Sequence, residues 1–234
     1  MIGNVVFRCR CGVATLALLA WFGAADAVAQ GRPRPRPAAA AQRQSRSIQY
    51  GGYAMFGRIN FTAVESFDAI VGNSSGQIVG GGARIGLPLG GLFVDVGAWR
   101  YRGDGERVFV ADDRIFKLGI PVEITVTPIE LSAGWRFRIR RAPKFIPYAG
   151  GGFTILKYQE TSDFANGDEN ADDSFSGYHL LSGAEYRIMR WLGVAGEASW
   201  STVPDAIGEA GVSAAFDETD LGGTTFRVKI TIGR

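Results

Sequence analysis

The chain has 234 residues, of which 46% are apolar, and its 25 basic and 23 acidic side chains give a formal net charge of +2. This near balance disfavours nucleic-acid binding. In addition, much of the basic excess lies in one short segment, residues 31–46, and not in the rest of the chain. Beyond residue 30 no segment is long and apolar enough to form a membrane helix, so any spanning of a membrane must be done by strands.

The N-terminus has the three parts of a secretory signal peptide. Arg8 and Arg10 precede an apolar run over residues 13–22, and the small-x-small sequence Ala27–Ala29 follows the run. A membrane anchor is the alternative, but this run is shorter than the roughly 20 apolar residues of a spanning helix. We therefore expect export of the protein and removal of residues 1–29.

Residues 30–50 form a basic segment rich in proline and alanine. Arginine and proline alternate over residues 31–37. Since proline favours extended chain and like charges repel, we expect a stiff, solvated linker. An electrostatic tether to anionic lipid headgroups or to acidic cell-wall polymer is the sharper alternative.

Residues 51–234 are enough for one domain, in which apolar and polar residues alternate along several segments. In Thr225–Ile232, even positions are apolar and odd positions are polar or charged, which is typical of a β-strand with two different faces. The eight predicted strands span residues 53–62, 77–87, 92–102, 122–139, 145–158, 178–188, 192–200 and 225–232. The domain is therefore expected to be all-β.

The fourth predicted strand changes phase at Pro128. Val122, Ile124 and Val126 alternate in one phase, whereas from Ile129 onward the apolar residues stand at odd positions. A slip of one residue beside a proline predicts either a β-bulge or the point where the strand leaves a membrane.

The connections between the strands alternate in length. Those after odd-numbered strands are long and span residues 63–76, 103–121, 159–177 and 201–223. Those after even-numbered strands are tight turns at residues 88–91, 140–144 and 189–191. Short periplasmic turns that alternate with long extracellular loops are typical of an outer-membrane barrel, and an even number of strands returns both termini to the periplasmic side.

Together with this order of loops, the segments Pro147–Gly152, Tyr178–Ile188 and Phe226–Ile232 resemble the small eight-stranded outer-membrane barrels, the OmpA/OmpX-like class often described as porin-family proteins. The resemblance covers residues 51–234. It implies an eight-stranded antiparallel up-and-down transmembrane β-barrel that contacts outer-membrane lipid and is inserted by the barrel-insertion machinery. Such proteins commonly end on an aromatic residue that this machinery recognises, whereas this chain ends on Arg234.

The interior of an eight-stranded barrel is just wide enough for side chains to fill it. The charges that we expect to point inward are Arg58, Arg84, Asp95, Glu130, Arg136, Arg138, Glu185, Arg187, Glu197, Arg227 and Lys229. This arrangement turns the apolar face of the first strand, with Met55 and Ile59, toward lipid. Buried charges must be paired, and folding about the turn at 88–91 puts Arg84 opposite Asp95 as a cross-strand ion pair.

This set of charges has two interpretations. It is either a satisfied, plugged core that stabilises the barrel, or a gate in which partners exchange and open a narrow path for water and small ions. Glu185, Arg187, Glu197 and Arg227 lie on the last three strands and are the candidates for such an exchange. Because basic residues outnumber acidic ones in the set, an open path would have a weak preference for anions.

Four aromatic residues are candidates for the girdles that flank the apolar band of a membrane barrel. They are Trp135, Tyr186, Trp191 and Trp200. Packing of some of them inside the barrel is the alternative.

No motif in the sequence predicts a cofactor, a defined metal site or enzymatic activity. His179 is the only histidine, and Ser182 stands three residues away on the same strand, so the two point to opposite faces and cannot form a dyad. Ser174 or a serine on another strand is the alternative partner of this histidine. The sequence Asp168-x-Asn170-x-Asp172 begins like a calcium loop but lacks the glycine and the glutamate that such a loop needs. It is expected to be a solvated acidic loop, with loose divalent-ion binding as the alternative.

These observations predict a monomeric integral outer-membrane barrel with a structural or surface-interaction role. Its interior would be plugged, and its long extracellular loops could bind an unknown surface ligand. One alternative is a narrow gated pore for small solutes or ions. Another is a secreted soluble barrel of the lipocalin type, with apolar side chains inside around a hydrophobic ligand and charges outside.

Overall fold

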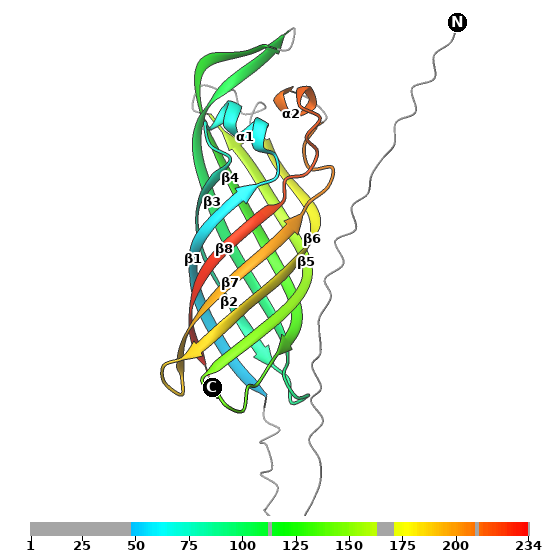
Figure 1. Cartoon of the computed structure of the whole chain (residues 1–234). Coiled ribbons are helices and arrows are strands. Elements are labelled where there is room, and N and C mark those ends of the chain that lie inside the picture. Colours follow the sequence, from blue (N-terminus) through cyan, green and yellow to red (C-terminus); the bar gives the residue numbers. More distant parts are fainter. Residues whose placement is uncertain (1–47, 112–113, 163–170, 209–210, 234) are drawn as a thin grey trace, which may run out of the picture. The chain divides into compact units, whose positions relative to one another are not determined.

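The computed structural model describes residues 48–111, 114–162, 171–208 and 211–233. They form a closed barrel of eight strands in which each strand is antiparallel to the next and β8 pairs with β1 (Figure 1). The strands are β1 (Gln49–Phe61), β2 (Ser75–Gly86), β3 (Leu92–Ala111), β4 (Arg114–Arg136), β5 (Phe145–Thr161), β6 (Ala171–Arg187), β7 (Leu192–Thr202) and β8 (Gly223–Gly233). The predicted eight-stranded up-and-down barrel is confirmed.

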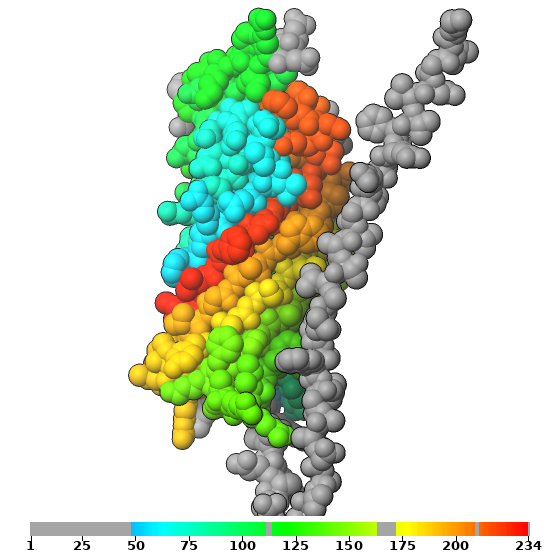
Figure 2. Space-filling model, viewed as in Figure 1, coloured from blue at the N-terminus to red at the C-terminus, as the bar shows by residue number. Residues whose placement is uncertain are grey.

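The two ends of the barrel differ. The start of β1, the end of β8 and the three short turns lie at one end, here called the turn end, and two short helices and a long hairpin lie at the other, the loop end (Figure 1). Seen from outside, the strands wind obliquely around the wall as continuous bands (Figure 2). The predicted signal peptide at 1–29, the linker up to residue 47 and the acidic segment around Asp168 lie outside the described residues.

The β3–β4 hairpin is longer than predicted. β3 continues to Ala111 and β4 begins at Arg114, so most of segment 103–121, expected to be a loop, is paired strand. Phe109 lies opposite Phe116 in this extension. The correction has a physical reason, because aromatic and β-branched side chains favour strands, and they recur through this segment.

The other predicted loops are also more ordered than expected. β5 and β6 extend to Thr161 and from Ala171 into the loop predicted at 159–177. The first and last long loops contain the short helices α1 (Val64–Ile70) and α2 (Gly211–Ala215). In the part of the chain that the structure describes, no helix is long and apolar enough to cross a membrane.

The phase change at Pro128 occurs without a bulge. β4 keeps one register with β5 on both sides of the proline, from Thr127 opposite Lys157 to Ile129 opposite Ile155. The register shift of β4 lies instead in its hairpin with β3. A bulge beside the proline is therefore the wrong alternative.

What changes at this proline is the chemistry of the two faces of β4. Toward the turn end, Glu130 and Ser132 are buried inside, while Leu131 is exposed outside. Toward the loop end, the buried inward residues are Val126 and Ile124. This inversion is expected where a strand passes from lipid into water, so the exit of β4 from the membrane at Pro128 is the alternative that stays a prediction.

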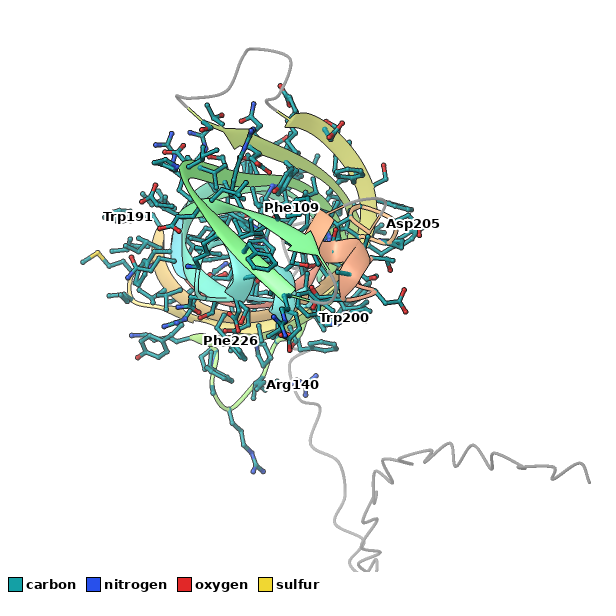
Figure 3. The ribbon with its side chains drawn as sticks, turned by 90° about the horizontal axis from the view of Figure 1, so that it is seen from above. Phe109, Arg140, Trp191, Trp200, Asp205 and Phe226 are labelled. Carbon is teal, nitrogen blue, oxygen red and sulfur yellow. The ribbon has the colours of Figure 1, made fainter. Side chains whose placement is uncertain are left out.

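The outer surface has aromatic side chains at two levels. Trp135, Tyr186 and Trp191 lie toward the turn end, and Tyr178 and Trp200 lie toward the loop end. In the view from above, Trp191 and Trp200 lie on the outside of the barrel wall (Figure 3). Tyr178 and Tyr186 are separated by about 26 Å along β6 at the usual rise of a strand, or by about 20 Å along the axis of a barrel with the usual tilt. All these side chains are 42–58% exposed, so none is packed in the interior. Their role as interface girdles stays a prediction.

The loop end of the interior is filled by an apolar cluster. Phe67 of α1 stacks on Phe61 of β1 with ring centroids 4.0 Å apart, and Tyr101 of β3 packs edge-on against both rings. The buried members of this apolar plug are Met55, Ile59, Phe61, Ala63, Phe67, Ile78, Trp99, Tyr101, Ile124, Val126, Leu156, Val203, Ala206 and Leu221. Helix α1 therefore places one aromatic ring in the mouth of the barrel, beside a cavity of about 350 Å³ that Phe67, Ile70, Ile124 and Leu221 help to line.

The carboxylate of Glu218, in the connection to β8, links that connection to α1. Its two oxygens accept the backbone N–H groups of Glu65 and Ser66, at 3.0 and 2.8 Å. The side chain of another residue thus satisfies N–H groups that the first turn of a helix leaves without partners.

Replacing Glu218 with alanine should loosen α1 without unfolding the barrel. Loss of a helix cap costs about 0.5–2 kcal/mol, so chymotrypsin cleavage at Phe67 should be about 2- to 30-fold faster. Asp217→Asn is the matched control, because Asp217 is exposed and asparagine tolerates its φ of 54°. Equal cleavage rates in the two variants would contradict a capping role for Glu218.

Candidate functional site

The charged interior lies between the apolar plug and the turn end. Seven of the predicted inward charges are buried there: Arg84, Asp95, Glu130, Glu185, Glu197, Arg227 and Lys229. Arg136 and Arg187 are partly buried at the turn-end mouth. These side chains project from β2, β3, β4, β6, β7 and β8, so closure of the barrel brings them together.

Two predicted inward charges face outward. Arg58 is exposed on the outer face of β1, where its guanidinium donates to the hydroxyl of Ser75. The inward face of β1 is formed by its apolar residues, including Met55 and Ile59, so the predicted orientation of this strand is wrong. Arg138 is exposed because β4 ends before it, at Arg136.

Glu197 of β7 binds two cations of β8 in the middle of the interior. Its carboxylate lies 2.6 Å from Lys229 Nζ and 3.2 Å from Arg227 Nε. It also accepts the hydroxyl of Tyr148 at 2.9 Å. The side chains of Glu197 and Arg227 are 0% exposed and that of Lys229 is 2% exposed, so their charges are shielded from water and depend on one another.

Arg227 also reaches across the barrel to Glu130 of β4. Its two terminal nitrogens lie 2.7 and 3.1 Å from the two oxygens of that carboxylate, in the paired geometry that favours arginine. Ser199 accepts a further hydrogen bond at 2.7 Å, and the indole N–H of Trp99 donates to Glu130 at 2.9 Å. The central cluster, defined as Glu130, Glu197, Arg227 and Lys229, thus has two acids and two bases from β4, β7 and β8, with further hydrogen-bond partners on β3, β5 and β7.

Arg84 and Asp95 form the predicted cross-strand ion pair. The two residues are opposite each other in the β2–β3 register, and Arg84 Nε lies 2.8 Å from Asp95 Oδ2. Tyr53 donates to the other oxygen of Asp95 at 2.6 Å. The guanidinium also lies over the rings of Phe93 and Tyr148, at 4.6 and 4.7 Å, in the geometry of a cation–π contact.

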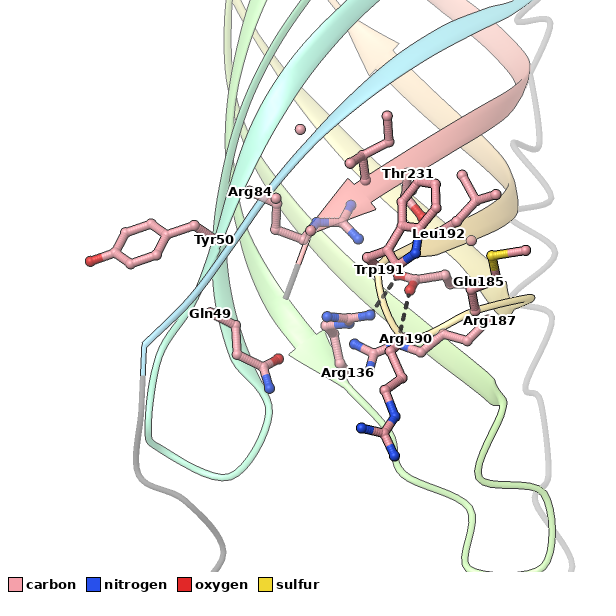
Figure 4. A pocket seen from close by; sticks show the side chains of 17 residues that line it. Gln49, Tyr50, Arg84, Arg136, Glu185, Arg187, Arg190, Trp191, Leu192 and Thr231 are labelled. Atoms are coloured by element: carbon pink, nitrogen blue, oxygen red, sulfur yellow. Dashed lines mark hydrogen bonds and ion pairs between the residues drawn. The ribbon is translucent and has the colours of Figure 1, made fainter.

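At the turn-end mouth, one carboxylate serves two arginines. Glu185 of β6 lies 2.5 Å from Arg136 of β4 and 3.3 Å from Arg187 of its own strand (Figure 4). A cavity of about 60 Å³ opens beside this group. The charged interior is therefore continuous from the central cluster to this mouth.

The sequence prediction missed a buried polar triplet around His179. Its two ring nitrogens lie 2.7 Å from Ser132 Oγ and 2.8 Å from Thr154 Oγ1. The residues belong to β6, β4 and β5, and alternation along those strands was the only signal that all three point inward. Each of them is at most 3% exposed and both ring nitrogens have a partner, so the triplet is a satisfied core contact.

The described residues contain no group of three or more histidine, cysteine or acidic side chains that could hold a metal ion. The charges of the interior are instead matched mainly by one another. This arrangement can hold strands together and exclude water, and it offers positions where ion pairs can exchange.

Solved structures of three outer-membrane or surface proteins are similar to this chain at low identity, and the first of them, with a TM-score above 0.5, has the same fold. A major outer membrane protein from Thermus thermophilus is 12% identical over 80% of this chain and 100% of that chain, with a TM-score of 0.52. Neisserial surface protein A is 11% identical over 79% of this chain and 96% of that chain, with a TM-score of 0.48. The N-terminal β-barrel domain of Pseudomonas aeruginosa OprF is 11% identical over 79% and 97%, with a TM-score of 0.44.

No curated protein matches the sequence. A family model does, and its match covers residues 36–231, which include nearly the whole barrel. The closed eight-stranded topology agrees with this match. The chain therefore belongs to the outer membrane protein β-barrel domain family, whose place is the outer membrane.

Proposed function

We propose that this protein is an integral outer-membrane barrel with a structural or surface-interaction role and a closed interior. Its wall contacts lipid, its turn end faces the periplasm, and its loop end presents α1, α2 and the β3–β4 hairpin at the cell surface. The short turns support this orientation, since they are periplasmic in barrels of this kind. The proposal assigns no catalysis to the chain.

The observation that carries this proposal is the filling of the interior at two successive levels. The central cluster pairs each of its buried charges, with side-chain exposures of 0–8% for Glu130, Glu197, Arg227 and Lys229. The apolar plug lies above it and places the ring of Phe67 in the mouth. A small barrel filled in this way favours stability over conduction.

Two measurements test the proposal together. The protein folded in detergent should migrate differently on a gel before and after boiling, as a stable barrel does. The same material in a planar bilayer should give no conductance steps, with a general porin as the positive control. Regular conductance steps in the wild-type protein would overturn the closed interior while leaving the barrel itself intact.

A narrow gated pore is the second candidate, and one feature favours it. Arg227 contacts both Glu130 and Glu197, and Glu197 contacts both Arg227 and Lys229. Partners could therefore exchange without leaving any charge alone at an intermediate step. Such a pore would show brief openings with a weak preference for anions in the same bilayer experiment.

The soluble lipocalin-type alternative has less support. Below the level of Pro128 the described strands turn charges inward and large apolar side chains outward, opposite to what a lipocalin needs. Above that level the interior is apolar, and a cavity of about 350 Å³ lies there beside Phe67, Ile124 and Leu221, which is the one feature that a lipocalin-type barrel would share. The family match also places the chain among outer-membrane barrels.

A further inference from the structure

The turn-end mouth has more positive than negative charge. Four arginines line the cavity of about 60 Å³, namely Arg84, Arg136, Arg187 and Arg190, and Glu185 is the one acidic residue among its described lining (Figure 4). Arg84 is paired with Asp95, and Glu185 is shared by Arg136 and Arg187. The group thus contains four guanidinium groups and two carboxylates, which is an excess of about two positive charges.

Two nitrogens in this group are buried without a hydrogen-bond acceptor among the described residues. They are Nη2 of Arg84 and Nε of Arg136. Arg84 as a whole is only 8% exposed. A buried donor with no acceptor is costly, and a charged one more so, so these two nitrogens indicate a place for an acceptor that the described residues do not supply.

We propose that this cavity binds a phosphate-type oxyanion. A planar guanidinium presents parallel N–H groups that match the oxygens of phosphate, and several arginines around one cavity can each contribute such donors. The excess of about two charges matches a phosphate dianion. The volume suits one small anion, since it is about twice the roughly 30 Å³ that one water occupies in the liquid.

Two sources supply this chemistry at a periplasmic mouth. One is free inorganic phosphate. The other is the phosphodiester headgroup of a lipid in the inner leaflet, since Trp191 on the rim of the cavity is also exposed on the outside of the barrel. The shared group is the phosphate, and the experiment separates the two sources.

The test is calorimetric titration of the folded full barrel in an uncharged glucoside detergent with inorganic phosphate as the probe. We expect saturable binding of one phosphate per barrel. Arg190→Gln should weaken binding about tenfold or more, because it removes a charged donor from the rim. Arg190 is exposed in a turn, so this variant should fold normally, and Arg136→Gln serves as a second test inside the mouth.

Arg140→Gln is the matched control. Arg140 is also an exposed arginine in a turn at the same end of the barrel, but it does not line the cavity (Figure 3). Its loss should change the affinity less than twofold. If Arg140→Gln and Arg190→Gln weaken binding equally, the attraction is diffuse and the proposed site is wrong.

Dihexanoylphosphatidylglycerol and dihexanoylglycerol separate the two sources. Tight binding of inorganic phosphate itself supports the free anion as the ligand. Binding of the phospholipid alone, lost in Arg190→Gln and absent for the phosphate-free lipid, supports the headgroup. The proposal is overturned if neither phosphate probe binds the wild-type barrel, or if dihexanoylglycerol binds as well as the phospholipid.

Discussion

Replacing Glu197 with alanine is expected to lower the free energy of unfolding by about 3–5 kcal/mol, the usual cost of removing one partner from a buried ion pair. The carboxylate lies within 3.2 Å of Arg227 and 2.6 Å of Lys229, and it accepts the hydroxyl of Tyr148. Without it, Glu130 is the remaining acid of the central cluster, and Lys229 has no nearby counter-ion in the cluster. A cation shielded from water in this way is costly to keep.

The measurement is a urea titration of the folded barrel, followed by tryptophan fluorescence and by the fraction that migrates as folded on an unboiled gel. Glu123→Ala is the control from the outside of the barrel. Glu123 lies 3.9 Å from Arg102, and both side chains are well exposed. Its removal should cost less than about 1 kcal/mol, because exposed ion pairs contribute little.

A second variant tests the cause of the loss. Adding Lys229→Met to Glu197→Ala removes the cation that the first change leaves alone, and it should recover part of the lost stability. If Glu197→Ala is as mild as Glu123→Ala, water already reaches these charges. That result would contradict the closed interior and favour the gated pore.

The sequence was sufficient to predict the number of strands, their order and one interior contact. Alternation and the long–short order of connections are local signals, and a tight turn fixes the register of the two strands beside it. That is why Arg84 and Asp95 could be placed opposite each other. The length of the β3–β4 hairpin was not predicted, because strands that leave the membrane have no lipid-facing apolar band to mark them.

Alternation gives two faces for each strand but does not identify the inner one. In lipid the outer face is apolar, and beyond the membrane the outer face is polar, so the same pattern has opposite meanings at the two levels. β1 shows the consequence, because Ile59 near the loop end points inward and Arg58 points outward. The sequence predicts that Arg58 points inward because it is charged. That assignment is correct only for a residue at the level of the membrane.

Contacts across the lumen could not be predicted from patterns within single strands and turns. Arg227 meets Glu130, and His179 meets Ser132, although these partners are on strands that are not neighbours in the sheet. Such contacts depend on the closure and tilt of the whole barrel. No spacing in the sequence encodes them, so the interior could be predicted as a set of charges but not as specific pairs.

The outward residues of β8 lie at different depths, and depth in the membrane determines how much folding free energy a charged side chain costs. Phe226 lies opposite Arg58 on β1 and Ala198 on β7, close to the level of Trp200, where the outer surface becomes polar. Val228 lies one step deeper, opposite Phe56, and is surrounded by apolar wall. A charge at Phe226 is near an interface and a charge at Val228 is nearer the middle of the lipid.

Val228→Arg should therefore cost about 2–4 kcal/mol of folding free energy in lipid vesicles, whereas Phe226→Arg should cost about 0–1 kcal/mol. The two changes introduce the same charge on the same face of one strand, so the difference reports depth alone. It can be measured by reversible urea unfolding in vesicles and, in cells, by the fraction of each variant that reaches the membrane as a heat-modifiable band. A larger cost for Phe226→Arg than for Val228→Arg would mean that the lipid lies nearer the loop end. The phase change at Pro128 would then lie inside the membrane, and the exit of β4 from lipid would have to be placed farther along the hairpin.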